Sequence, residues 1–118
     1  ALALGLPREQ YATPLPKSVT TAISMDVAAE LGGIAALTGA IVILTGIAGN
    51  LLAEVVCKIF HITDPIAKGV GIGTSAHAVG TSKALQMGEV EGAMSGLSIA
   101  VAGVLTAVLC PFFVGFIQ

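Results

Sequence analysis

Residues 73 to 83 read GTSAHAVGTSK, in which one histidine and one lysine stand among small and hydroxyl side chains. A helix that begins within this stretch would present backbone N–H groups and the positive end of its dipole, a combination that binds anions. The residues that could complete such a site are Gly73, Thr74, Ser75, His77, Thr81 and Lys83. The imidazole of His77 could donate to a carboxylate or exchange a proton near neutral pH. This stretch therefore predicts the binding of a small carboxylate.

A second polar stretch, nearer the start of the chain, repeats this chemistry. The residues that could serve there are Lys17, Ser18, Thr20 and Thr21, placed where we expect a short helix over residues 19–31 to begin. Asp26 and Glu30 lie at i and i+4 on that helix. Either could carry a coupling proton or cation, although exposure at the membrane interface explains them equally well. For the hydroxyl side chains, the alternative is a hydrogen bond to the backbone of their own helix.

The composition indicates that lipid surrounds the elements that carry these residues. The chain has 118 residues, of which 55 % are hydrophobic and 10 % are charged, and its mean hydropathy is +0.97. Soluble domains carry about 25 % charged residues. The formal net charge of −2 and the lack of a basic run exclude nucleic acid as a partner. The sequence therefore predicts an integral membrane protein whose first partner is the lipid bilayer.

Two stretches without charge are long enough to cross a bilayer. They are residues 31–53 and 92–118. At about 1.5 Å per residue, either stretch reaches across a hydrocarbon core of about 30 Å. We expect spanning helices at about 31–57 and 90–117, the second kinked or ended near Cys110 and Pro111.

The segment before each span is rich in Gly, Ser and Thr, which argues against a plain spanning helix. We expect broken or re-entrant helical segments at about 14–33 and 64–88. In the first of these, Gly32 and Gly33 supply a helix stop. The predicted fold class is all-α, a polytopic membrane protein with two spanning helices and two broken or re-entrant segments.

The second of these segments should contain a helix break near its middle. Asp64 followed by Pro65 is a helix start signal, and alternate glycines from position 69 onward predict a break over residues 71–75. A new helix would then be capped by Thr74 or Ser75. Non-helical backbone survives in a bilayer only inside protein or beside water, so the break predicts a packed or wet cavity.

The two polar segments are also weakly alike. Residues 14–24 read PLPKSVTTAIS and residues 65–75 read PIAKGVGIGTS, and each precedes a spanning helix. A match this short also arises by chance, so an internal repeat and coincidence both remain open. A repeat would fit transporter folds in which discontinuous helices of two repeats meet near the bilayer midplane.

Templates for catalysis and metal binding are missing from the sequence. It contains no HExxH, CxxC or GxSxG motif, and Cys57 with His61 offers at most two of the three or four ligands that zinc needs. We therefore expect no enzyme activity, no metal and no other cofactor.

Three other features have simple structural explanations. Lys58 and Lys68 are expected to extend to the membrane interface. Glu89 and Glu91 are expected to stabilise the N-terminus of the second spanning helix. A stripe of small residues predicts close packing against another helix, and its members are Gly92, Gly96, Ala100 and Gly103.

A family resemblance is carried by three stretches: PKSVTTAIS (16–24), ELGGIAALTGAIVILTGIAGN (30–50) and GIGTSAHAVGTSKALQMGEVEGAMSGLSI (71–99). Together they resemble the LrgB/CidB family of bacterial membrane proteins. The resemblance covers nearly the whole chain and corresponds to the C-terminal half of such proteins. It implies that residues 1–118 form a single membrane domain, a fragment of a longer polytopic protein of the bacterial plasma membrane.

The resemblance also implies functions and partners. Family members are described as antiholin-like proteins that act beside a small holin-like partner of the LrgA/CidA type and are linked to murein hydrolase activity and cell lysis. Relatives include a plastid-envelope glycolate/glycerate translocator, and bacterial pairs are connected with pyruvate uptake. The carboxylate site argued from the residues suits the transporter description better.

The family signature falls on two sets of residues in this chain. They are Pro16, Lys17, Ser18, Thr20 and Thr21, and then Gly73, Thr74, His77, Gly80 and Thr81. The chain departs from the family pattern at Ala22 (where proline is expected), Ala78 (often glycine) and Lys83 (often arginine). Lysine keeps the charge of arginine but loses its bidentate geometry toward a carboxylate, so the substrate stays open.

Two functions therefore stand side by side. The first is a secondary transporter, or its core half, that moves a small monocarboxylate such as glycolate, glycerate or pyruvate, with Lys17 and His77 as the partners of the anion. The second is an antiholin-like regulator that associates through its helices with a holin-like partner. We expect a homo-oligomer in either case.

Overall fold

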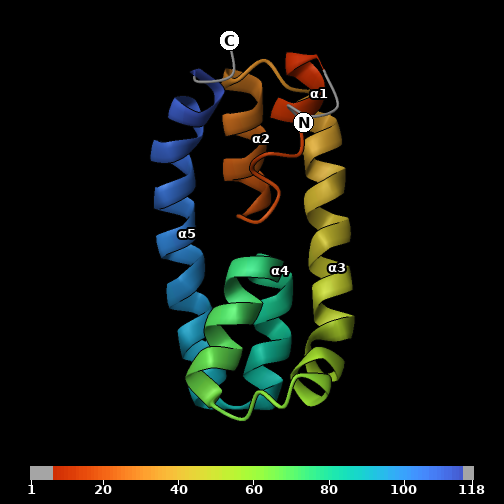
Figure 1. The fold of residues 1–118 in the computed structure, drawn as a ribbon, viewed down its shortest axis with the longest axis vertical. Helices are drawn as coiled ribbons and strands as arrows, with labels where there is room; N and C mark the ends of the chain where they lie inside the picture. The colour runs from red at the N-terminus through yellow and green to blue at the C-terminus, as the bar shows by residue number, and fades with distance from the viewer. Residues whose placement is uncertain (1–6, 116–118) are drawn as a thin grey trace.

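The computed structural model describes residues 7–115 and contains helices and no strand over that range (Figure 1). Its elements in chain order are α1 (Arg8–Ala12), α2 (Thr21–Glu30), α3 (Ala35–Ile59), α4 (Pro65–Met87) and α5 (Glu89–Gly115). Helices α3 and α5 are long rods that run in opposite directions, and the shorter segments lie between them (Figure 1). The predicted all-α fold class is confirmed.

Helices α3 and α5 are the two predicted spanning helices. Both are long and apolar enough to cross a membrane, yet only 22 % and 17 % of their most apolar windows are buried within the chain. A core helix of a soluble protein would be mostly covered, whereas here large side chains such as Leu44 and Leu51 are 66 % and 71 % exposed. These apolar surfaces are suited to lipid.

The end of α2 confirms the predicted glycine stop and moves the start of the first span. Gly32 adopts a left-handed φ of +82°, and the N–H of Gly33 donates to the Ala28 carbonyl over 2.7 Å. This is the six-to-one hydrogen bond of a Schellman motif. Because the chain turns there, α3 begins at Ala35 rather than near residue 31.

The second span agrees with the prediction of about 90–117, because α5 runs over Glu89–Gly115. The sequence predicted a kink or an end near Cys110 and Pro111, and the helix does not end there, since it continues through Pro111. A proline removes only one backbone N–H, and the apolar residues on both sides of it continue the spanning helix.

Helix α4 is a helical hairpin, because its backbone leaves helical geometry at His77, where φ is 43° and ψ is −141°. A Cβ built on Gly80 would lie 3.0 Å from the side chain of Ile72, whereas residues eight apart in a straight helix are about 12 Å apart. Ile72 also shares a buried cluster with Ala84. Figure 1 shows the two halves side by side, with the tip of the hairpin at mid-height of the molecule.

The break was predicted two residues too early, over 71–75. Those residues are helical, and Thr74 and Ser75 do not cap a new helix. Their hydroxyls donate instead to carbonyls one turn back, at 2.7 Å and 2.6 Å. The glycines of this half-helix serve close packing rather than a break, since a Cβ on Gly73 would collide with the backbone of Ser95.

The two halves of α4 pack on different spanning helices. The first half contacts α5 through Gly69 with Glu91 and Gly73 with Ser95. The second half contacts α3 through Val79 with Asn50 and Lys83 with Glu54. Residue numbers rise together in both sets, so the first half runs parallel to α5 and the second half runs parallel to α3. The hairpin therefore fills the space between two antiparallel rods.

The first polar segment also enters and leaves on one side of the molecule. After α1, the chain descends to mid-height over residues 13–20, and α2 returns to the same end (Figure 1). The hydroxyl of Ser24 donates to the Pro16 carbonyl over 2.6 Å, and that of Thr38 donates to the Thr13 carbonyl over 2.8 Å. These bonds fix the descending segment against α2 and α3.

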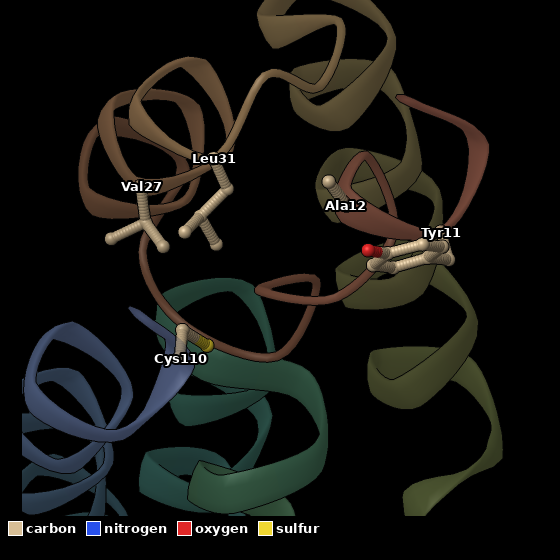
Figure 2. Packing of buried hydrophobic residues seen from close by; sticks show 5 residues of the cluster. All are labelled: Tyr11, Ala12, Val27, Leu31 and Cys110. Atoms are coloured by element: carbon tan, nitrogen blue, oxygen red, sulfur yellow. The ribbon is translucent and has the colours of Figure 1, made fainter. Parts of the chain in front are cut away.

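The α1–α2 end of the molecule closes on the end of α5. Figure 2 shows the buried cluster there, formed by Tyr11, Ala12, Val27, Leu31 and Cys110. Lower on the same pair of helices, a Cβ on Gly103 would lie 3.2 Å from the side chain of Ile23. Helix α2 thus runs parallel to α5 with its returning end buried.

The chain is built of two units that run in opposite directions. Each unit has a re-entrant segment with a mid-height tip followed by a spanning helix, and the two enter from opposite ends (Figure 1). The suspected pairing of residues 14–24 with 65–75 is wrong in register. Residues 65–75 form the first half of a hairpin, whereas residues 14–24 contain a tip and the start of a returning helix.

Candidate functional site

The tip of α4 is anchored to α3 by the side chain of His77. The residue is 2 % exposed, and its Nε2 lies 2.8 Å from the Val42 carbonyl. A carbonyl oxygen can only accept, so Nε2 carries the proton in this arrangement. A Cβ on Gly46 would lie 2.6 Å from the ring carbon Cε1, so this glycine makes the space for the imidazole. The positive φ of His77 is rare for a residue with a side chain, and its neighbours hold it there.

The same tip is tied to α5 through two hydroxyls. Thr81 Oγ1 lies 2.9 Å from the His77 carbonyl and 2.7 Å from Ser95 Oγ. The Thr81 hydroxyl has one hydrogen, which it gives to the carbonyl, so Ser95 donates to Thr81. Ser95 is fully buried. The predicted site residue Thr81 therefore secures the tip from the side opposite His77.

Asn50 is a contact residue that the sequence reasoning missed. Its Nδ2 donates to the Val79 carbonyl over 2.9 Å and to Ser82 Oγ over 3.1 Å. A lone amide at the end of an uncharged apolar run is costly in a bilayer unless it has a partner. An asparagine in an apolar run, with Gly46 one turn before it, could have predicted that this face of α3 packs against the α4 hairpin.

The tip of the first re-entrant segment presents a cation. Lys17 is exposed, and its ammonium donates to Ser18 Oγ over 2.9 Å. Thr20 is the N-cap residue of α2 but makes no side-chain capping bond within the described residues. The first N–H groups of α2 are therefore not covered by a cap. Thr21 opens that helix and lies against α3, with its methyl carbon 3.8 Å from a Cβ built on Gly39.

The two tips have the same electrostatic character at their returning helices. Helix α2 starts at the first tip and the second half of α4 starts after His77, and both run away from mid-height toward opposite ends (Figure 1). A helix N-terminus carries about half a positive charge. The second tip also holds the end of the first half of α4, where a helix carries about half a negative charge, so the positive potential at the middle of the molecule comes chiefly from Lys17 and the start of α2.

The other predicted site residues lie away from these tips or in packing roles. Lys83 forms an ion pair with Glu54 at 2.7 Å and faces α3. Asp26 and Glu30 are exposed on α2. Gly73 is buried against α5, and the hydroxyls of Thr74 and Ser75 are used by their own helix. Among residues 7–115, no group of three or more His, Cys, Asp or Glu side chains could hold a metal ion.

The fold and these tips define a class of helical membrane protein, one built of two oppositely directed units that each combine a re-entrant segment with a spanning helix. The model of the LrgB-like family matches residues 1–116. The chain belongs to this family.

Curated relatives give the same result. The chain is 39 % identical over 117 residues to proteins named antiholin-like protein LrgB from Bacillus mycoides, Bacillus cereus and Bacillus anthracis. Each match covers 99 % of this chain and 51 % of the relative. The chain thus spans about half the length of the relatives it matches. No solved structure matches it.

Proposed function

We propose that this chain forms the substrate-binding core of a secondary transporter for a small monocarboxylate of the size of glycolate, glycerate or pyruvate. The observation that carries the proposal is the pair of half-helices that begin at mid-height tips and run toward opposite ends of the molecule (Figure 1). Transporters with inverted repeats bind anionic groups at the N-termini of such discontinuous helices near the bilayer midplane.

The anion would be held chiefly at the first tip. Lys17 supplies the charge, the uncapped amides at the start of α2 supply backbone donors, and the hydroxyls of Ser18 and Thr20 lie beside them. In this proposal His77 is a positioning residue. Its ring is buried on the Val42 carbonyl and keeps the second tip at mid-height.

The test is uptake of labelled glycolate, pyruvate and lactate into liposomes that contain the full-length protein. Substitution Lys17→Gln removes a charge-assisted interaction of about 1.5–3 kcal/mol, so uptake should fall roughly 10- to 100-fold at low substrate concentration. The matched control is Arg8→Gln, which removes a cation in α1, outside both tips, and should leave uptake unchanged. Saturable uptake that is equal in the wild type and in both variants would contradict the proposed site.

A second function is favoured by the names of the relatives given above, which are antiholin-like proteins. Such a protein would act by packing a helix against a holin-like membrane partner. Helix α5 offers a place for this contact, because a Cβ on Gly96 would meet no atom within 4 Å. Gly96→Leu should then abolish control of lysis in cells while leaving liposome uptake intact. The opposite result, with uptake lost and lysis control retained, would favour transport alone.

A further inference from the structure

An open cavity of about 580 Å³ lies at the end of the molecule where α3 ends and where α4 and α5 begin. Its walls carry side chains of both charges, and the charged ones are Glu54, Lys58, Lys68 and Glu91. The cavity is far from the tips, because it is built from the last turns of α3 and the opposite end of the hairpin (Figure 1). It is therefore separate from the proposed carboxylate site.

Glu91 is the unusual member of this set. The residue is 9 % exposed, lines the cavity and forms no salt bridge with any residue in the range 7–115. A Cβ on Gly88 would collide with its Oε2, so the glycine lets the carboxylate fold over the link between α4 and α5. The carboxylate oxygens of Glu91 are open to the cavity, because no side-chain oxygen of the described residues is both buried and without a hydrogen-bond partner. A ligand in the cavity can therefore place a positive group against this carboxylate.

The lysines on the other walls of the cavity, Lys58 and Lys68, could bind a negatively charged group of the same ligand. Lys68 is half-buried in the first turn of α4 and has no ion-pair partner among the described residues. Lys58 lies 3.9 Å from Glu54, and that glutamate is already bound by Lys83 at 2.7 Å. Among the described residues the cavity therefore presents the Glu91 carboxylate and the Lys68 ammonium without ion-pair partners, and the Lys58 ammonium with only a long contact to Glu54, a pattern complementary to a zwitterion.

A second, largely apolar cavity of about 320 Å³ continues from the first. The two share Cys57, Ile62 and Lys68 in their walls. The second runs between α3 and the first half of α4, along Leu52 and Val56 on one wall, and these two residues are 53 % and 41 % exposed. A cavity with charged side chains at the helix ends, continued by a more apolar groove along a spanning helix, matches the headgroup and the acyl chain of a phospholipid.

We propose that this end of the protein binds one phospholipid with a primary ammonium and a phosphate in its headgroup, as in phosphatidylethanolamine. The ammonium pairs with Glu91, the phosphate lies between Lys58 and Lys68, and one acyl chain occupies the groove between α3 and α4. Charge complementarity selects this occupant, because an anionic headgroup without an amine brings no cation to Glu91, and the quaternary ammonium of phosphatidylcholine has no N–H to donate to its carboxylate.

The experiment measures lipid retention by native mass spectrometry of the full-length protein. The protein is taken from nanodiscs that contain equal parts of phosphatidylethanolamine, phosphatidylglycerol and phosphatidylcholine. We expect phosphatidylethanolamine to be retained at least about 10-fold over the other two, the ratio that one charge-assisted contact supplies. Glu91→Gln keeps the shape of the side chain and should remove this preference.

A pair of glycine variants tests the groove. Gly71 lines it, and a Cβ there meets no atom within 4 Å, so Gly71→Leu fills the groove without a clash and should lower retention of all three lipids. Gly96→Leu is equally unhindered but lies outside both cavities, so it should retain lipid like the wild type. The proposal is overturned if phosphatidylglycerol is retained as well as phosphatidylethanolamine, if Glu91→Gln keeps the preference, or if the two leucine variants behave alike.

Discussion

The two re-entrant tips have similar positions and opposite constructions. The first, over residues 13–20, is held from outside by the hydroxyls of Ser24 and Thr38, which donate to its carbonyls and leave Lys17 exposed. The second is a single non-helical residue, His77, whose ring is buried on a neighbouring helix. One tip presents its cation outward, whereas the other uses its imidazole to hold itself in place. Polar residues that look equivalent in the sequence thus divide into binding and anchoring roles.

The largest expected effect on stability comes from displacing the ring of His77, which holds the second tip against α3. Gly46→Val would place a Cβ 2.6 Å from the ring of His77 and 2.8 Å from Val79 Cβ, so the hairpin must shift. Overpacking of this kind costs about 1–3 kcal/mol in the free energy of unfolding, measured by unfolding in mixed detergent. Gly96→Val is the control, since its added atoms meet open space and its stability should not fall. Equal stability of the two variants would mean that the ring is not seated on α3.

A smaller effect tests the conformation of His77 itself. Replacement by Ala or Gly removes the same hydrogen bond, but only Gly adopts a φ of 43° without strain. His77→Ala should therefore be less stable than His77→Gly by about 1 kcal/mol. In a continuous helix the order is reversed, with Ala favoured by about 1 kcal/mol. Unfolding titrations of the two proteins decide between a hairpin and a rod.

The smallest expected effect is a difference between the two re-entrant tips in how much one substitution lowers the free energy of unfolding. Ser95→Ala removes the donor to Thr81 and should lower stability by about 0.6 kcal/mol, the average for hydrogen bonds between membrane helices. Lys17→Gln at the open tip should change stability by less than about 0.5 kcal/mol. A destabilisation by Lys17→Gln larger than that by Ser95→Ala would show that the first tip, too, is an anchor.

The sequence was sufficient for the parts of the fold that composition controls. Two runs without charge predicted both spans, and Gly32 and Asp64 marked a helix stop and a helix start that the structure confirms. The position of the break in α4 could not be predicted from the sequence. Glycines that allow a neighbouring backbone to pack closely on a helix look the same in a sequence as glycines that end a helix. A histidine at positive φ gives no compositional signal at all.

The site was predicted in part for a related reason. Chemistry alone selected Lys17 and His77, but only the packing shows that the ring of His77 faces α3 and that Lys83 is paired with Glu54. Glu91 was interpreted from its place in the sequence as a helix-end carboxylate. Its burial depends on how the hairpin folds back over α5, which no local pattern encodes.

The double attachment of residue 77 has a mechanical consequence. Its ring is hydrogen-bonded to Val42 on α3, and its carbonyl is connected to α5 through the hydroxyls of Thr81 and Ser95. If α3 slides along α5 by a helical turn, the bonds of the hairpin to α3, through His77, Asn50 and Lys83, and its bond to Ser95 on α5 cannot all survive. Any axial displacement of the two spanning helices must therefore detach the hairpin from one of them.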